Sequence, residues 1–448
     1  MRIAILESTL ARSTGRLDPK HLFSARDVPA VKTGAQRRLG DLGRLWGPSR
    51  FKRVYATAAE ESVPYLRPYD IFDYLPGPAD WLSRARSDNL AELMVEPGTI
   101  LQTCSGRNLG PAVLAGGFLA AFAISHDLVR IEIDDATDRL TALAYLRTEQ
   151  GKRAIARDRA GSVIDHLTPG QVAAVPIPDI AAAPEIARLV GRAQRLRDIA
   201  RRRLQTLQKR TEAAVSMVAP PKLRDGWTVP SSSLMGRTDA AFYDPFVTAT
   251  REHLGAVGAP AIGDLARVEK PGGRYSPRYV APVHGEPLLS GRQILQWFPI
   301  ALKHVAVISF RDVAPYRLAS GTIVYQADGR AEEGLGTPSV VTAARAGWLA
   351  SGHVGRLVAR EGQHWGAIYL GLASRQGQAQ IRAAASGSVV DSTFPADMEA
   401  VLVPPVTPAM ATSAERAWSA LAAADDLERR ATELVESSLV AAATTSAA

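Results

Sequence analysis

The chain has 448 residues, of which 46% are hydrophobic and 22% charged, so it is long enough for two or three globular domains and is not dominated by disorder. Its lone Cys104 excludes an internal disulfide, and no cationic leader or run of about 20 apolar residues indicates export or membrane insertion. We therefore expect a cytoplasmic protein without a membrane partner. The net charge of +8 is compatible with a polyanionic partner such as nucleic acid.

The sequence contains an internal repeat, in which the second copy begins about 223 to 227 residues after the first. Glycines, a Gly-Ser pair and apolar runs recur in one order with small gaps, which indicates a duplicated fold. The matches are Leu39 to Arg44 with Ile262 to Arg267, Pro97 to Ile100 with Ser320 to Ile323, Tyr145-Leu146 with Tyr369-Leu370, and Gly161-Ser162 with Gly387-Ser388.

Each copy follows the same plan along the chain. In the first copy, residues 128–133 alternate like a strand with one buried face, and residues 143–157 predict a helix that ends near Gly161. In the second copy, residues 305–308 predict a buried strand and residues 368–385 a helix that ends near Gly387. Each copy closes with a Pro-rich exit, Pro176-Ile177-Pro178 or Pro404-Pro405.

A long stretch of helical periodicity follows each exit, at residues 181–215 and 408–440, with apolar residues three and four apart. Nine basic residues against three acids lie between Glu185 and Glu212, whereas six acids against three arginines lie between Glu415 and Glu436. Opposite charge balance favours pairing of the two helices. We therefore expect an intramolecular antiparallel coiled coil; the alternative is that each helix packs on its own module.

These elements predict an α+β protein with two duplicated domains, each a curled β-sheet with helices followed by a long helix. The expected boundaries are residues 1–180 and 217–407 for the two domains, and residues 181–216 and 408–441 for the helices.

Recognisable enzyme motifs are missing from the sequence. It has no Gly-x-x-x-x-Gly-Lys-Ser/Thr loop, no zinc-type Cys pair, no His-Glu-x-x-His and no Gly-x-Ser-x-Gly elbow. It also lacks the Asn/Asp-Pro-Pro-aromatic tetrapeptide that resembles an amino-methyltransferase active site. His126 and His353 occupy roughly corresponding positions, and we interpret both as structural because no paired acid or nucleophile repeats with them. A non-catalytic chain without its own cofactor or metal is therefore expected.

The ordered set of repeated motifs resembles the specificity subunit of type I restriction-modification systems over nearly the whole chain. It comprises the glycine turns at Gly98 and Gly321, the Tyr-Leu pairs, the Gly-Ser pairs and the Pro-rich exit before each long helix. The resemblance implies two target-recognition domains that each read half of a split DNA sequence, with a helix pair as spacer. It also implies DNA methyltransferase subunits that carry S-adenosylmethionine, and a restriction/translocase subunit.

Basic and polar loops at matching places in the two copies are the candidates for contact with double-stranded DNA, because arginine and lysine bind phosphates while arginine, asparagine and glutamine read base edges. The first set is Arg44, Arg50, Lys52 and Arg53, which corresponds to Lys270, Arg274, Tyr275 and Arg278 in the second copy. The second set is Arg67 and Tyr69, which corresponds to Arg292 and Gln293. The third set is Arg107 and Asn108, which corresponds to Arg330. Ser162 and Ser388 are weaker candidates, as phosphate donors.

Two alternatives stay open. The same modules would also suit a scaffold in another defence system that grips protein, or DNA without methylation. A hydrolytic enzyme would need clustered carboxylates, and the repeated pairs Asp41 with Asp264 and Asp165 with Asp391 are interpreted as caps or turn formers.

Overall fold

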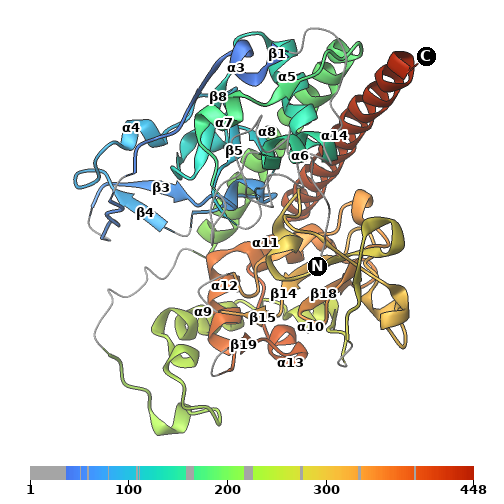
Figure 1. Cartoon of the computed structure of the whole chain (residues 1–448). Helices are drawn as coiled ribbons and strands as arrows, with labels where there is room; N and C mark the ends of the chain where they lie inside the picture. The colour runs from blue at the N-terminus through green and yellow to red at the C-terminus, as the bar shows by residue number, and fades with distance from the viewer. Residues whose placement is uncertain are drawn as a thin grey trace. The chain divides into compact units, whose positions relative to one another are not determined.

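The structure, a computed structural model, describes residues 37–50, 52–57, 60–78, 80–106, 109, 111–157, 166–215, 226–272, 276–330, 334–387 and 390–447 (Figure 1). The chain divides into two compact units. Unit 1 comprises the described parts of Met1–Phe72, Pro76–Asp198 and Ala423–Ala448, and unit 2 comprises those of Asp73–Leu75 and Ile199–Ala422. Both long helices are thus shared between the units.

Unit 1 is built on two main sheets. The larger is antiparallel, in the order β2 (Arg44–Trp46), β8 (Leu128–Glu132), β5 (Ile100–Thr103), β6 (Ala112–Leu114). The smaller has the order β4 (Asp80–Ser83), β3 (Ser62–Leu66), β7 (Ala123–Ile124), with β3 and β7 parallel. A third pair joins β1 (Arg37–Arg38) to β9 (Pro176–Ile177). The helices are α3 (Leu39–Leu42), α4 (Leu90–Leu93), α5 (Ala136–Arg147), α6 (Glu149–Arg157) and α7 (Pro169–Ala173).

Unit 2 repeats this plan. Its larger sheet has the order β10 (Ala266–Glu269), β18 (Val354–Ala359), β14 (Ile323–Gln326), β16 (Pro338–Val340). Its second sheet has the order β11 (Tyr279–Val280), β13 (Lys303–Val305), β12 (Glu286–Leu289), β17 (Leu349–Ala350). A short pair joins β15 (Asp328–Gly329) to β19 (Asp391–Ser392). The helices are α9 (Pro245–Ala256), α10 (Ile262–Leu265), α11 (Trp365–Ala373), α12 (Arg375–Ala384) and α13 (Pro395–Glu399).

The duplication extends to strand register. Ile100 on β5 faces Leu114 and Ile131, and Ile323 on β14 faces Val340 and Leu357. The same central strand thus has the same two neighbours in each unit. The α+β class and the duplicated domains predicted from the sequence are confirmed.

The two long helices are α8 (Ala183–Ala213) and α14 (Pro408–Ala447), the red helix at the C-terminus in Figure 1. In unit 1, Arg197 of α8 hydrogen bonds Glu428 of α14 at 2.7 Å. In unit 2, Arg203 hydrogen bonds Ser413 at 2.6 Å. Contacts that advance along α8 therefore retreat along α14, which confirms the expected antiparallel pair.

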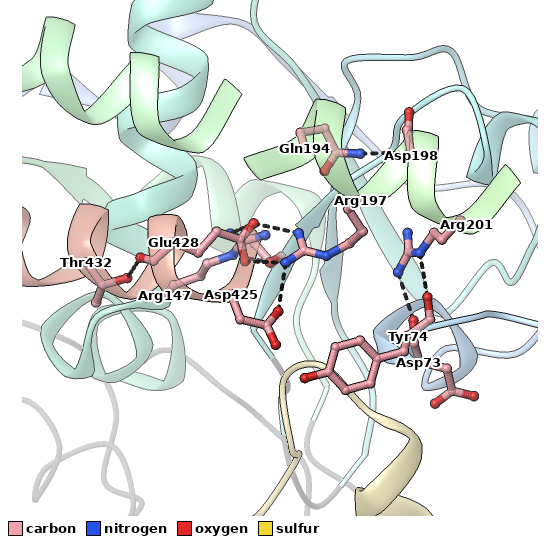
Figure 2. A network of polar contacts seen from close by, with 11 residues as sticks. Asp73, Tyr74, Arg147, Gln194, Arg197, Asp198, Arg201, Asp425, Glu428 and Thr432 are labelled. Atoms are coloured by element: carbon pink, nitrogen blue, oxygen red, sulfur yellow. Dashed lines mark hydrogen bonds and ion pairs between the residues drawn. The ribbon is translucent and has the colours of Figure 1, made fainter. Parts of the chain in front are cut away.

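A buried ion network holds α8, α14 and α5 together in unit 1 (Figure 2). Glu428 lies 2.7 Å from Arg197 and 2.9 Å from Arg147, and Arg197 also reaches Asp425 at 3.3 Å. Burial by itself raises the pKa of the Glu428 carboxyl, but the charges of Arg147 and Arg197 outweigh it and lower the pKa to about 2. Glu428 is therefore ionised at neutral pH.

The helix predicted at residues 143–157 is two helices, and so is its counterpart. The hydroxyl of Thr148 accepts from the Gly151 amide at 3.0 Å and starts α6, as Ser374 accepts from Gly377 at 3.1 Å and starts α12. Since Thr148 corresponds to Ser374, Tyr145 corresponds to the glycine three residues before Ser374. The match of Tyr145-Leu146 with Tyr369-Leu370 is thus wrong by two residues.

Two strand predictions need correction. The strand predicted at residues 305–308 ends at Val305, and a 3-10 turn at Val307–Ser309 leaves the side chain of Ile308 81% exposed. Strand β8 was expected to bury one face only, yet Arg130 is buried as well. The two Nη groups of its guanidinium donate to the backbone carbonyls of Ile124, Ser125 and Leu128 at 2.5 to 2.9 Å.

Candidate nucleic-acid interface

The same four loops meet at one end of the larger sheet in each unit; we call each set a loop cluster. They follow β2 or β10, follow β5 or β14, precede β8 or β18, and precede α7 or α13. In unit 1, the amide of Cys104 donates to Asp127 O at 3.2 Å, and the amide of Leu167 donates to Cys104 O at 2.8 Å. These backbone hydrogen bonds join three of the loops and thereby position the polar side chains of the unit 1 loop cluster.

In unit 2 the equivalent bonds run from the Ala327 amide to His353 O at 2.9 Å and from the Thr393 amide to Ala327 O at 2.8 Å. Cys104 therefore corresponds to Ala327, and His353 corresponds to Asp127. The predicted correspondence of His126 with His353 is off by one residue.

Asp328 is the centre of the unit 2 loop cluster. Its carboxylate lies 2.8 Å from the Lys270 ammonium and 2.7 Å from Nδ1 of His353. Burial raises the pKa of the Asp328 carboxyl, but hydrogen bonds from Lys270, Ser392 and His353 outweigh it, and the pKa is lowered. An ionised carboxylate thus fixes one cation and one imidazole at the end of the sheet.

Unit 1 has different side chains on the same backbone. Ser105 Oγ lies 2.7 Å from Nδ1 of His166, and Ser105 and His166 form a bridge between their loops as Asp328 and Ser392 do. The pKa of His126 is lowered chiefly by burial, with contributions from Arg53 and Arg50 that act against the field of Asp127. The arginines of the loop after β2 thus impose positive potential on this cluster, as phosphate contact requires.

Eleven of the predicted contact residues lie in the described part of the chain. Eight of these are exposed: Arg44, Arg50, Lys52, Arg53, Arg67, Arg278, Arg292 and Arg330. Seven of the eleven are held by protein partners: Arg44 over Trp46, Arg53 over Tyr65, Arg67 by Asp80, Arg292 by Asp73, Lys270 by Asp328, Gln293 by Ser290 and Ile300, and Tyr69 half-buried against Gly106. The remaining six, Arg107, Asn108, Ser162, Arg274, Tyr275 and Ser388, lie outside the described residues.

One of the predicted loop pairings shifts in the structure. The backbone amide of Arg67 donates to the Asp70 side chain at 2.8 Å in unit 1. In the equivalent turn of unit 2, the amide of Ser290 donates to the Gln293 side chain at 3.1 Å. Arg67 therefore corresponds to Ser290 rather than to Arg292, and Tyr69 corresponds to Arg292.

The residues that sequence reasoning missed are Ser105, His166 and Asp328. Ser105-Gly106-Arg107 and Asp328-Gly329-Arg330 align in the sequence, so the equivalence of Ser105 with Asp328 is visible there. His166 and His353 come from different loops, so no alignment of one copy with the other pairs them. Only the fold places each beside the residue that stands two positions beyond the end of the central strand.

Within the described ranges, no three His, Cys, Asp or Glu side chains lie where they would together hold a metal ion. In the same ranges, none of the helices has both the length and the apolar character that a membrane span needs. Asp41 and Asp264 are helix caps, as predicted. The carboxylate of Asp41 accepts from the Arg38 amide at 2.7 Å, and that of Asp264 accepts from the Ala261 amide at 3.0 Å. Asp165 lies outside the described residues.

Similar chains are found among solved structures. The chain is similar to specificity subunits of type I restriction-modification systems. The S subunit from M. genitalium is 14% identical, with 92% of this chain and 94% of that chain covered and a TM-score of 0.29. The HsdS subunit from Thermoanaerobacter tengcongensis is 12% identical, with 90% and 96% covered and a TM-score of 0.27. A chain from a structure described as the complex assembly and conformational transition of the type I R-M system is 15% identical, with 90% and 97% covered and a TM-score of 0.28.

No family model matches the chain, and no curated protein does.

Proposed function

We propose that this chain is the DNA-recognition subunit of a type I restriction-modification complex and carries no catalytic site of its own. Each unit binds one half of a bipartite duplex site through its loop cluster. The observation that carries the proposal is the duplication of that cluster, with equivalent backbone bonds and different side chains in the two units. A shared backbone arrangement that carries different polar side chains suits two domains that recognise different base sequences.

The basic residues support DNA as the ligand. Arg50 and Lys52 in unit 1 and Arg278 and Arg330 in unit 2 are exposed in or beside the clusters. Cations of this kind supply affinity by releasing counterions from phosphates, whereas base contacts supply specificity. Arg107 and Asn108, with Arg274 and Tyr275, stay in the proposal as further contacts, as do Ser162 and Ser388.

The helix pair is proposed to set the gap between the half-sites and to dock the methyltransferase subunits. Helix α8 has 31 residues, so it spans about 46 Å at about 1.5 Å per residue. In this proposal the partner subunits bind S-adenosylmethionine, a further subunit translocates and cuts DNA, and the complex works in the cytoplasm.

The test is to co-express the chain with a neighbouring methyltransferase gene and to map modified bases in the host DNA. We expect a split motif that carries N6-methyladenine and that disappears when this chain is omitted. A stable purified complex that adds no methylation would overturn the proposal in favour of a scaffold that grips protein or DNA without modification.

A further inference from the structure

Each unit holds one exposed histidine by its Nδ1 atom at the end of the central strand. In unit 1, Nδ1 of His166 lies 2.7 Å from Ser105 Oγ, and in unit 2, Nδ1 of His353 lies 2.7 Å from Asp328 Oδ2. Ser105 and Asp328 are equivalent, because each directly follows the residue that bonds the loop before β8 or β18. Two different loops thus deliver an imidazole to the same place.

The hydrogen bond at Nδ1 decides what the other ring nitrogen offers. A carboxylate only accepts, so Asp328 requires the proton on Nδ1 of His353, and Nε2 of the neutral ring is then an acceptor. The side chain of His353 is 71% exposed while that of Asp328 is 14% exposed. The Nε2 edge is therefore the polar edge that a ligand can reach.

The surroundings of Asp328 fit a ligand that is itself an anion. A bare carboxylate at this position would repel phosphates, but the ammonium of Lys270 at 2.8 Å neutralises it. Unit 1 needs no such cation because Ser105 is uncharged. The serine hydroxyl can donate or accept, so it permits either tautomer of His166.

We propose that His166 and His353 are the specificity-determining residues of the two loop clusters, and that each reads one base edge through Nε2. Ser105 and Asp328 are positioning residues that fix the ring. The inference rests on the proposed DNA-recognition function. As an acceptor, His353 suits the amino groups of cytosine N4 or adenine N6 in the major groove. His166 can present either a donor or an acceptor, so the two units are suited to different bases.

The experiment is selection of bound duplexes from a randomised DNA library by the full chain with its methyltransferase subunits, followed by sequencing. His353→Asn keeps an amide near the Nδ1 position but removes the outward nitrogen, whereas His353→Gln keeps a polar group near the Nε2 position. We expect H353N to lose about tenfold of the discrimination at one base pair of one half-site, and H353Q to retain part of it. His166→Asn should do the same in the other half-site only.

Asp328→Asn separates base reading from mere support. Asparagine offers Nδ1 a donor as well as an acceptor, so it releases the tautomer of His353. We expect D328N to change which base is preferred at the position read by His353 and to leave the preference in the other half-site unchanged. His304→Asn, on β13 outside the loop cluster, is the matched control and should leave both half-sites as they are.

The outcomes are distinct. If the wild-type complex selects a split motif and the histidine variants select the same motif with the same discrimination, the reading role is wrong while the proposed function stands. If the wild-type complex, folded and intact, selects no motif at all, the proposed function fails and this inference fails with it.

Discussion

Units 1 and 2 share the strand order of the larger sheet and the hydroxyl caps of α6 and α12, but they bury their long helices with different chemistry. In unit 1, Arg147 at the end of α5 meets Glu428 of α14. Since Thr148 corresponds to Ser374, Arg147 corresponds to Ala373, and no charge stands there in unit 2. Unit 2 packs aromatic rings instead. Trp418 of α14 lies 5.3 Å from Tyr369, measured between ring centroids, and 5.2 Å from Tyr74.

One buried charge is common to both units. Arg130 on β8 and Arg356 on β18 occupy the same strand position and bond the carbonyls at the ends of β7 and β17, Ile124 O at 2.9 Å and Ala350 O at 3.4 Å. Burial lowers the pKa of both guanidinium groups to about 10. The two units thus share the arginine that joins their two sheets, whereas their contacts to the long helices differ.

Removing the acid of the unit 1 network gives the largest expected effect. Glu428→Gln leaves the buried Arg147 without its counter-charge and Arg197 with Asp425 alone, and it should lower the free energy of unfolding by about 4 kcal/mol. Urea unfolding measures the loss, and hydrogen exchange should localise it to unit 1. The control is Asp426→Asn, on the same helix but exposed, for which we expect a change within about 0.5 kcal/mol.

The equivalent break in unit 2 is Trp418→Ala. It removes a buried ring that touches two tyrosines and should cost about 3 to 4 kcal/mol, because the cavity only partly collapses. Hydrogen exchange should now rise in unit 2 and stay unchanged in the sheets of unit 1. Equal exchange increases in both units would show that they unfold as one and would end the comparison.

Lowering the pH should weaken the ion network of unit 1 but not the aromatic packing of unit 2. The pKa of Glu428 is lowered to about 2 in the folded protein, so its contribution is complete above its ordinary value of 4.5 and is lost as the pH falls from there toward 2. The stability difference between wild type and E428Q should therefore shrink over that range, by on the order of 3 kcal/mol. The difference between wild type and Trp418→Ala should stay constant over the same range. A wild-type to E428Q gap that does not move between pH 5 and pH 3 would contradict the assignment.

The smallest effect is expected from the caps that the units share. Thr148→Ala and Ser374→Ala each remove a hydroxyl that accepts from a helix amide, and each should cost about 1 kcal/mol. The two losses, measured by thermal unfolding, should agree within experimental error. A cap that matters in one unit only would mean that the duplicated backbone is not equally supported.

The long helices were predictable because their periodicity runs far beyond the length of one turn. Residues 181–215 and 408–440 were expected, and Ala183–Ala213 and Pro408–Ala447 are observed. The break at Thr148 was not predicted, since a hydroxyl within an apolar helical pattern does not reveal whether it will cap a new helix. Residues 305–308 failed for a related reason. An apolar run of four does not distinguish a strand from an exposed 3-10 turn.

The candidate site was predicted only in part. Basic residues near the repeated glycines did lead to the loop clusters, but Arg67, Lys270 and Arg292 turned out to be held by carboxylates. Such pairs join residues far apart in the chain, and the sequence does not reveal them.

By itself the sequence determined the duplication, the α+β class and the two helices with complementary charge, because these depend on local periodicity and on repeated spacing. Only the tertiary structure decided that Arg197 pairs with Glu428, that Arg130 is buried, and that Ser105 and Asp328 each fix a histidine. The pairings of Arg197 and of the two histidines depend on contacts between residues that lie 25 to 231 positions apart. Chain folding sets such contacts through sheet register and helix packing, and a small shift in either would change every partner.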